Sequence, residues 1–205
     1  MSFNLLYRPL VLTGPSGVGK TALIRDLLKD YGTKFELMIS HTTRKPRENE
    51  KHGVHYYFTD HEVFRKMVLD KKFLEFNQVH TNYYGSTIEE LLRINSLKKI
   101  ALFDIDIQGA LDVNKFKDQF TCNFLFILPP SMEELQRRLM GRKTESDEAL
   151  RVRLANAQQE IDSALKSGLY QENDYIVKED WHSYHTFLKR VKELYDLDGN
   201  TIQGK

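Results

Sequence analysis

Short apolar runs alternate with helical patterns along most of the chain. The first run, Pro9 to Gly14, precedes a stretch from 21 to 28 in which apolar residues at 23, 24, 27 and 28 share one helical face. Further apolar runs lie at four places, most of them followed by a helical stretch: 36–40, 99–106, 123–128 and 174–177. Parallel strands are buried on both faces and are joined by helices. The pattern therefore predicts an α/β fold with a central parallel sheet flanked by helices.

Two hydroxyl residues mark expected helix starts. Ser131, after two prolines, is followed three residues later by Glu134, and Thr87 is followed by Glu90. In a capping box the hydroxyl accepts a hydrogen bond from the third helical residue, whose carboxylate reaches back to the cap. We therefore expect helices to begin directly after both residues.

Two stretches depart from the alternation. Residues 40–86 are rich in Tyr, Phe and His and contain two strand-like pieces, His55 to Thr59 and Phe73 to Val79, which predict a small inserted β-rich subdomain. The stretch from Arg137 to Arg153 mixes basic and acidic residues around Gly141. Its pattern is compatible with a mobile lid and equally with two solvated helix ends.

Composition narrows the class of protein. The 205 residues are 40% hydrophobic, enough for the core of one domain. Lys and Arg number 30 against 29 Asp and Glu, which argues against a nucleic-acid coat protein or a polybasic membrane protein. There is no apolar run near the roughly 20 residues that span a bilayer, no signal-peptide pattern, and only Cys122, so no internal disulfide. We expect a cytoplasmic protein without nucleic-acid or membrane partners.

A phosphate-binding motif follows the first predicted strand. Eight residues match G-x-x-x-x-G-K-[ST]: Gly14, Pro15, Ser16, Gly17, Val18, Gly19, Lys20 and Thr21. In such a P-loop the backbone N–H groups and the helix start face phosphate oxygens, and the lysine neutralises the β and γ charges. Thr21 would offer its hydroxyl to Mg²⁺. The alternative is a glycine-rich turn without a ligand, and the strand and helix on either side argue against it.

Two aspartates end a predicted strand. Asp104 and Asp106 are two residues apart, so in a strand their side chains point the same way. The carboxyl end of a central parallel strand borders the crevice where α/β proteins bind ligands, and one carboxylate could hold Mg²⁺ through water. The alternative is a pair of solvated acids at a strand end.

Candidate acceptor-binding residues lie in the β-rich stretch. Arg44 and Arg47 flank a proline, and two guanidinium forks suit a phosphate monoester. Glu75 interrupts the apolar piece Phe73 to Phe76, and Asn82 to Ser86 adds two phenols, a glycine and a hydroxyl. Taken singly, each is compatible with a solvated arginine, an outward strand glutamate or a packed tyrosine.

Together these motifs resemble the guanylate kinase family of P-loop nucleoside monophosphate kinases, from residue 9 to about 195. Eight segments follow one another in the order of that family: GPSGVGKT, SHTTRKPRENEKHGVHYYF, FLEF, NYYGS, LFDIDIQG, LFILPPS, RRLMGRKTES and RLANAQ. The resemblance implies a P-loop NTPase core at 1–39, 87–140 and 156–205. It also implies a GMP-binding subdomain at 40–86 and a lid over ATP at 141–155.

The resemblance further implies roles for single residues. Residues assigned to the GMP phosphate are Arg44, Arg47, Tyr56 and Tyr84, and those assigned to the rest of the GMP pocket are Ser40, Glu75, Gly85, Ser86, Asp104 and Asp106. Residues assigned to catalysis are Lys20, Arg47 and the lid and hinge arginines Arg138, Arg142 and Arg153, with Thr21 and Asp104 at the metal. Where the family has Asn-Asp near the adenine of ATP, this chain has Lys178 and Glu179.

The chemistry of the residues agrees with that implication. Guanine presents adjacent N1–H and N2–H₂ donors that an ionised Glu75 accepts, whereas adenine would leave the carboxylate unpaired. Phosphoryl transfer depends on positioning and charge neutralisation more than on a covalent participant, which accounts for many arginines and no nucleophile triad. We therefore expect ATP + GMP ⇌ ADP + GDP with Mg²⁺, catalysed by a monomer or weak dimer.

Two other functions remain to be weighed. The first is a guanylate-kinase-like interaction module that has lost catalysis and binds a phosphorylated peptide in its former GMP pocket. Such modules typically lack a working P-loop, whereas Lys20, Thr21, Arg142 and Arg153 are present here. The second is another nucleoside monophosphate kinase such as adenylate kinase, which conflicts with Glu75 and with the β-rich insertion.

Overall fold

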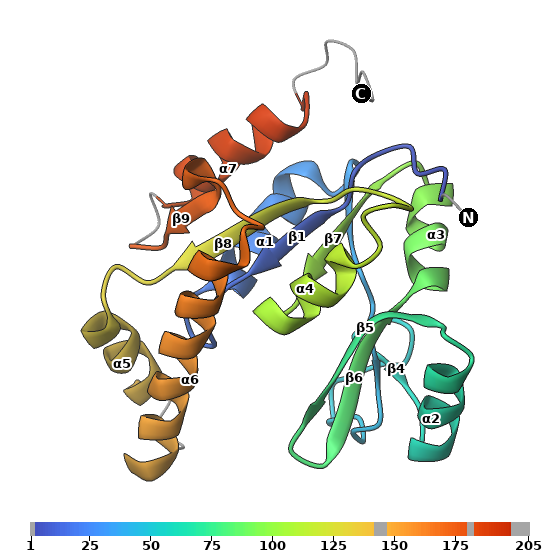
Figure 1. Cartoon of the computed structure of the whole chain (residues 1–205), viewed down its shortest axis with the longest axis horizontal. Helices are drawn as coiled ribbons and strands as arrows, with labels where there is room; N and C mark the ends of the chain where they lie inside the picture. Colours follow the sequence, from blue (N-terminus) through green and yellow to red (C-terminus); the bar gives the residue numbers. More distant parts are fainter. Residues whose placement is uncertain (1–2, 142–146, 180–182, 198–205) are drawn as a thin grey trace.

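Two sheets of different topology make up the fold (Figure 1). The structure is a computed structural model that describes residues 3–141, 147–179 and 183–197. The larger sheet has the strand order β2-β7-β1-β8-β9, and all its neighbouring strands are parallel. Its strands are β1 (Leu10–Thr13), β2 (Phe35–Leu37), β7 (Ile100–Asp104), β8 (Asn123–Leu128) and β9 (Tyr175–Val177). This sheet confirms the predicted central parallel sheet.

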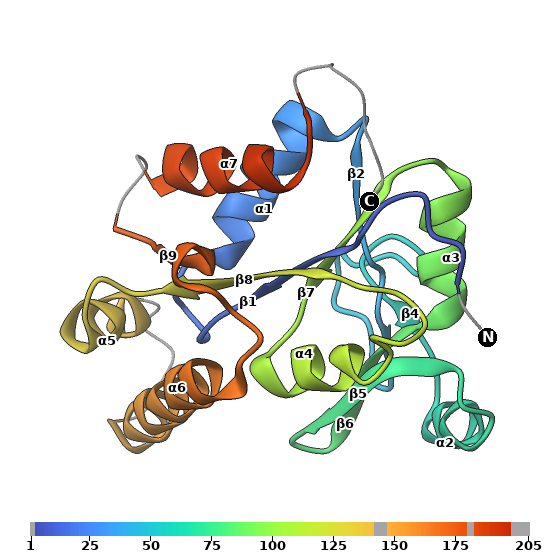
Figure 2. The ribbon, with the colours of Figure 1, turned by 45° about the horizontal axis from the view of Figure 1, so that its top comes forward.

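Helices cover both faces of the larger sheet. Figure 2 shows α1 and α7 on one face and α4 and α6 on the other. The helices are α1 (Lys20–Tyr31), α2 (His61–Leu69), α3 (Ile88–Ser96), α4 (Ile107–Asn114), α5 (Met132–Met140), α6 (Asp147–Ser167), α7 (Ser183–Leu194) and the short 3₁₀ helix η1 (Glu172–Asp174). Within the described ranges, none of them combines the length and the apolar character needed to cross a bilayer.

Alternation along β1 divides the core into two layers. Leu10 and Leu12 pack on the side of α1 and α7, together with Leu27 and Phe187. Val11 points to the other face and packs with residues of α3 and α4. All three β1 residues are fully buried. Because β1 is enclosed on both faces, the P-loop that follows it starts from a fixed position.

The smaller sheet lies between β2 and α3 in the sequence. It has the order β4-β3-β6-β5, in which β3 and β4 are parallel and the other pairs antiparallel. Its strands are β3 (His41–Thr42), β4 (Tyr57–Phe58), β5 (Phe73–Val79) and β6 (Asn82–Thr87). Helix α2 covers it through Phe64, whose ring stacks on Phe73 at 4.5 Å and on Tyr83 at 5.4 Å. This sheet confirms the predicted β-rich insertion as a feature of the fold.

Two predicted strands are shorter in the structure. The run at 36–40 gives only β2, because the chain leaves the larger sheet after Leu37 and crosses to the smaller one. The run at 99–106 gives β7, which ends at Asp104, while Asp106 is the N-cap of α4. An apolar pattern does not show at which residue the backbone stops pairing with the neighbouring strands.

The capping boxes are half confirmed. Ser131 and Thr87 each accept a hydrogen bond from the backbone N–H three residues on, at 3.2 Å. Neither glutamate is found reaching back to its cap. Glu134 instead pairs with two arginines one turn later on α5, and Glu90 pairs with Arg93 and with two groups outside α3. Charged partners bind a carboxylate more strongly than a neutral N–H does.

Candidate active site

The P-loop runs from the end of β1 to the start of α1. Gly14, Gly17 and Gly19 have φ angles of 137°, 85° and 109°, which residues with a side chain disfavour. A Cβ on Gly14 would also collide with the carbonyl oxygen of Ile127 in β8. Helix α1 begins at Lys20, so its free backbone N–H groups lie next to the lysine. The strand, loop and helix that the motif predicts are therefore all present.

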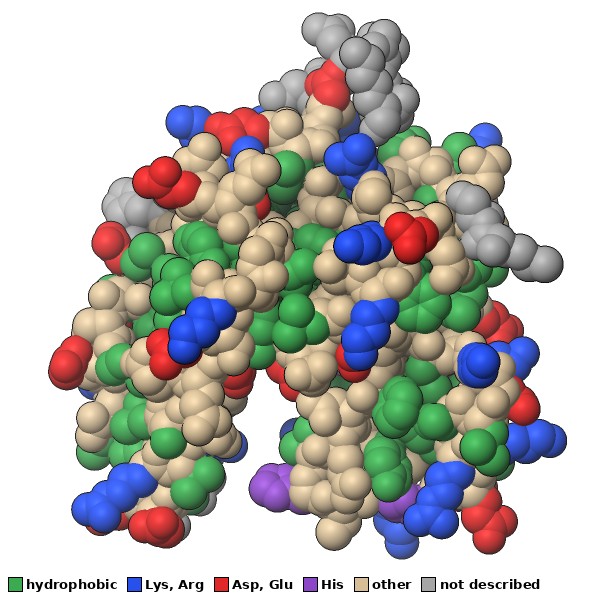
Figure 3. All heavy atoms as spheres, in the orientation of Figure 1, with side chains coloured by type: hydrophobic (Ala, Val, Ile, Leu, Met, Phe, Trp, Pro, Cys, Tyr) green, Lys and Arg blue, Asp and Glu red, His purple; other side chains and the backbone are tan. Residues whose placement is uncertain are grey.

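A cavity of about 790 Å³ opens in front of the P-loop. Besides the loop, it is lined by Tyr56 and Val79, which come from the smaller sheet and its approach, and by Asp104, Asp106 and Glu160. Figure 3 shows the molecule hollowed between the part built by α5 and α6 and the part built by β5 and β6. Residues from both sheets thus face a single cavity.

Lys20 meets three carboxylates across this cavity. Its Nζ donates a hydrogen bond to the carbonyl oxygen of Gly14. Burial lowers the pKa of Lys20, and the negative charges of Asp104, Glu160 and Asp106 act in the opposite direction. A lysine ammonium surrounded by carboxylates forms an ionic site that suits a phosphate chain together with a cation.

The two aspartates lie in different settings. Asp106 Oδ1 accepts a hydrogen bond from Gly109 N at 2.7 Å, and its Oδ2 accepts one from Nδ2 of Asn77 in β5 at 2.9 Å. Asp104 keeps solvent-accessible surface toward the cavity, where desolvation raises its pKa and Lys20 opposes the rise. Both line the cavity, but Asp106 does so from a helix cap and not from the strand. Its position also links the smaller sheet to the larger one.

Glu75 is a buried carboxylate and not an outward strand residue. Its residue exposure is 7%, and a Cβ on Gly109 would lie 3.2 Å from its Oε2. Desolvation raises the pKa of Glu75 to about 7, the hydrogen bond from the Ser86 hydroxyl opposes the rise, and the charge of Asp106 adds to it. Ser86 Oγ lies 3.4 Å from Ser40 Oγ. The structure brings these four predicted pocket residues together.

Arg44 is held by a residue that the sequence analysis did not single out. Its Nη1 and Nη2 donate to the two carboxylate oxygens of Glu50, both at 2.9 Å. These bonds and one from the backbone N–H of Arg47 lower the pKa of Glu50 to about 2. The Arg44 guanidinium lies 5.4 Å from the Tyr56 ring, which is 6.0 Å from the Tyr84 ring. Arg44, Tyr56 and Tyr84 are therefore neighbours, while the Arg47 residue is exposed at the edge.

Gly85 has a packing reason to be glycine. It lies in β6 between β3 and β5, paired with His41 and with Phe76. A Cβ at this position would lie 2.8 Å from the carbonyl oxygen of Glu75 and 2.8 Å from atoms of Phe73 and Phe76. The close approach of β5 and β6 beside Glu75 therefore requires a residue without a side chain.

Arg138 faces a different cavity from Lys20. A cavity of about 690 Å³ adjoins the P-loop and is lined by Arg138 together with Lys178 and Glu179. Arg138 donates from Nη1 to the carbonyl oxygen of Val18 at 3.1 Å and from Nη2 to that of Glu179 at 2.7 Å. The guanidinium thus connects the P-loop to the segment after β9.

The remaining arginines come from the predicted lid. Arg142 lies outside the described residues, and Arg153 is half-buried on α6. Two turns later on α6, Glu160 reaches the P-loop cavity, where burial raises its pKa to about 7 and Lys20 opposes the rise. The sequence analysis missed Glu160, although its spacing of seven from Arg153 places both on one helical face. It also missed Glu50, three residues after Arg47.

The cavity offers oxygen ligands for magnesium. The Thr21 residue and the Asp104 carboxylate line it together, and both supply the hard oxygen donors that Mg²⁺ prefers. Among the described residues, no group of three or more His, Cys, Asp or Glu side chains is arranged to hold a metal ion. Mg²⁺ usually binds through one or two carboxylates, waters and substrate phosphates, so this donor set fits it.

Comparisons with known proteins agree with the resemblance. A sequence profile described as guanylate kinase matches residues 6–196. "Guanylate kinase 1" of Oryza sativa subsp. japonica is 41% identical over 189 residues, which cover 92% of this chain and 48% of that protein. "Guanylate kinase" of Schizosaccharomyces pombe is 41% identical over 188 residues, which cover 92% of this chain and 91% of that protein.

A solved structure agrees as well. The crystal structure of guanylate kinase from Anaplasma phagocytophilum superimposes with a TM-score of 0.66 at 31% identity, covering 93% of this chain and 85% of that one. The chain spans about half the length of its plant relatives from Oryza sativa and Arabidopsis thaliana. The profile, the relatives and the fold lead to one conclusion: this chain belongs to the guanylate kinase family.

Proposed function

We propose that this protein transfers the γ-phosphoryl group of ATP to GMP, reversibly and with Mg²⁺. The observation that carries the proposal is the single cavity lined both by the P-loop of the larger sheet and by Tyr56 next to the smaller one. Two substrates bound to different sheets would meet there with their phosphates facing each other. Such an arrangement serves phosphoryl transfer between nucleotides, because positioning supplies most of the catalysis.

Glu75 selects the acceptor base in this proposal. A buried carboxylate is costly unless donors reach it, and the guanine N1–H and N2–H₂ groups supply two. Ser40, Ser86 and Asp106 border the same pocket. Arg44 and Tyr56, joined by Arg47 and Tyr84 at the rim, would hold the GMP phosphate.

Charge neutralisation supplies the rest of catalysis. Lys20 and the P-loop N–H groups bind the ATP phosphates, and Arg142 and Arg153 act on the transferring phosphoryl group. Arg138 lies in the neighbouring cavity and positions the P-loop that binds ATP. Thr21 and Asp104 would hold Mg²⁺, which when bound neutralises charge on the β- and γ-phosphate oxygens. No general base is needed, because the GMP phosphate, with a second pKa of about 6, is largely a dianion at neutral pH.

These roles assign a separate function to each segment of the chain. We assign GMP binding to residues 40–86, the ATP lid to 141–155 and the P-loop core to the rest. We also propose that the protein acts as a monomer or weak dimer, since the proposed residues all come from one chain. A single cysteine suits the reducing cytoplasm as its location.

A coupled assay of ADP formation with AMP, GMP, CMP and UMP tests the function. We expect turnover with GMP, and AMP poorer by up to about 10⁴-fold, because it would leave a buried acceptor unpaired. Lys20→Ala should retain less than about a tenth of kcat, since one lost transition-state contact costs about 2–4 kcal/mol. The matched control is Lys29→Ala, an exposed lysine in the last turn of α1, which should keep wild-type kcat.

Two results would contradict the proposal. Equal turnover of AMP and GMP would indicate a different nucleoside monophosphate kinase. No turnover of any nucleotide, combined with binding of a phosphopeptide, would indicate the interaction module.

A further inference from the structure

The chain crosses between the two sheets at two neighbouring places. It leaves the larger sheet through Met38–Ser40 and returns where β6 runs into α3, at Thr87. Glu90 lies at this junction, in the first turn of α3, and is only 2% exposed. A buried carboxylate is costly unless its oxygens are bonded, so its partners indicate what it does there.

Glu90 binds groups from three parts of the chain. Its Oε1 accepts hydrogen bonds from Ile39 N at 3.2 Å and from Arg93 Nη2 at 2.8 Å. Its Oε2 accepts from the Tyr57 hydroxyl at 3.1 Å and from Arg93 Nε at 2.8 Å. Ile39 belongs to the outgoing crossing, and Tyr57 belongs to β4 of the smaller sheet. One side chain therefore ties the crossing and the smaller sheet to the helix that follows it.

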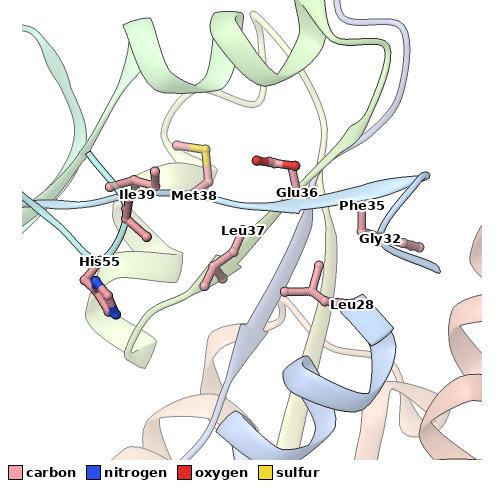
Figure 4. A pocket seen from close by; sticks show the side chains of 9 residues that line it. Leu28, Gly32, Phe35, Glu36, Leu37, Met38, Ile39 and His55 are labelled. Carbon is pink, nitrogen blue, oxygen red and sulfur yellow. The ribbon is translucent and has the colours of Figure 1, made fainter. Parts of the chain in front are cut away.

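The crossing borders a surface cavity on its other side. Residues 35–39 border a cavity of about 290 Å³, with Leu28 of α1 and His55 among its other lining residues. Figure 4 shows the side chains of Leu28, Leu37 and His55 around this space. Phe35 and Met38 of this segment are buried in the core, whereas Leu37 between them is exposed. The crossing is held by hydrogen bonds from Met38 N to the carbonyl oxygen of Leu102 in β7 and from Ile39 N to the Glu90 side chain.

Tyr57 connects this junction to the active site. It is the first residue of β4, and successive side chains near a strand point to opposite faces. Tyr57 bonds Glu90 on one side, while the preceding residue, Tyr56, lines the P-loop cavity. The ring of His41 in β3 also lies 4.8 Å from that of Tyr57, so the tyrosine is packed from within the smaller sheet.

We propose that Glu90 and Tyr57 form a clasp that sets the position of the smaller sheet, and of Tyr56 directly before β4, relative to the P-loop. Both are positioning residues, because neither lines the cavity in which the reaction would take place. The inference rests on the proposed transfer to GMP. It adds a residue pair on which the alignment of the two substrates depends.

The clasp has a distinct kinetic consequence. Arg44, Glu75 and Ser86 all belong to the smaller sheet or its loops, so they keep their mutual arrangement when this sheet shifts, and of the pocket residues around Glu75 only Asp106 lies outside it, at the start of α4. Lys20 belongs to the P-loop, which is attached to the larger sheet. The phosphates of ATP and GMP must still be brought into line for the transfer. Loss of the clasp should therefore lower kcat far more than it raises the KM for GMP.

Tyr57→Phe is the mildest test because it removes a single hydroxyl. We expect kcat to fall about five- to tenfold, the KM for GMP to stay within about threefold and ATP affinity to be unchanged, since small misplacements slow catalysis strongly. Glu90→Ala should lose more kcat than Tyr57→Phe. Glu90→Gln can still accept a hydrogen bond from Ile39 N, so its loss of kcat should be intermediate. The control is Tyr175→Phe, which removes a tyrosine bond to the Ala164 carbonyl at the far edge of the larger sheet.

Hydrogen exchange gives a readout that does not depend on activity. The backbone N–H of Ile39 should exchange faster in both Tyr57→Phe and Glu90→Ala than in the wild type, and at the wild-type rate in Tyr175→Phe. The clasp is overturned if folded Tyr57→Phe turns over GMP at the wild-type kcat, or if its only change is a lower unfolding temperature. A wild-type protein that does not phosphorylate GMP would instead overturn the proposed function, while the exchange result would still report on the clasp.

Discussion

At the residue scale, the role proposed for Glu75 predicts that GMP binding depends on pH. Its pKa of about 7 means that part of the protein carries a protonated Glu75 near neutrality. Guanine offers donors and would therefore favour the ionised carboxylate, so GMP bound as proposed should lower the pKa of Glu75 and release a proton. Affinity for GMP should consequently rise as the pH is raised from about 6 and level off above about 7. Calorimetric titration of GMP between pH 6 and 8 measures this directly.

A variant separates this effect from the titration of GMP itself. Glu75→Gln keeps the phosphate of GMP, with its own pKa of about 6, and removes the carboxylate. This variant should bind GMP more weakly and lose the part of the pH dependence that is centred near 7. The kcat/KM for GMP should also fall closer to that for AMP, while the affinity for ATP stays unchanged. If both proteins show the same pH dependence and the same ratio, guanine is recognised by other groups.

Site residues that are marked by their neighbours in the sequence could be predicted. Residues whose role depends on partners far away in the sequence could not. The P-loop carries its glycines and lysine within eight residues, and Glu75 stands out as a charge in an apolar segment. Glu90 looks like an ordinary first-turn glutamate, because its partners Ile39 and Tyr57 lie 51 and 33 residues away. Glu160 likewise gains its significance only when α6 packs toward the P-loop.

At the scale of the elements, the β5–β6 pairing depends on Gly85. Because a Cβ there would lie 2.8 Å from backbone and side-chain atoms of β5, Gly85→Ala must push the strands apart. We expect a loss of about 1–3 kcal/mol in the free energy of unfolding, as for other overpacked sites, and weaker GMP binding. Denaturant titration and GMP calorimetry measure the two effects.

Gly141→Ala is the matched control for stability. Its Cβ would make ordinary contacts at 3.6 Å, and the residue has helical backbone angles. Its free energy of unfolding should therefore stay at the wild-type value or rise slightly. Equal destabilisation by both substitutions would show that the close approach at Gly85 is not what matters.

Element boundaries show where a sequence pattern stops being informative. The predicted strands at 73–79 and 123–128 match β5 and β8, whose ends coincide with turns. The runs at 36–40 and 99–106 continue past the ends of β2 and β7, because the residues that follow each strand are still buried or half-buried. Hydrophobicity reports burial, and a connection between two sheets is buried as well.

At the scale of the whole molecule, the proposed function predicts that the cavity between the two sheets closes during the reaction. Arg44 and Glu75 lie with the smaller sheet and Lys20 with the P-loop of the larger one, so substrates bound as proposed should draw the two parts together and exclude water. Small-angle scattering should give a smaller radius of gyration with GMP plus a nonhydrolysable ATP analogue than with either ligand alone. An unchanged radius at saturation, verified by calorimetry, would count against closure.

The strand order also dictates how the protein can be assembled during synthesis. Leu10 of β1 pairs with Leu102 of β7 and Asn123 of β8, which are synthesised long after it. The hairpin of β5 and β6, by contrast, pairs neighbours in sequence and can form early. The apolar strand that carries the P-loop therefore waits unpaired on the ribosome while the smaller sheet is made. A nascent chain released before β7 and β8 exposes this strand to aggregation.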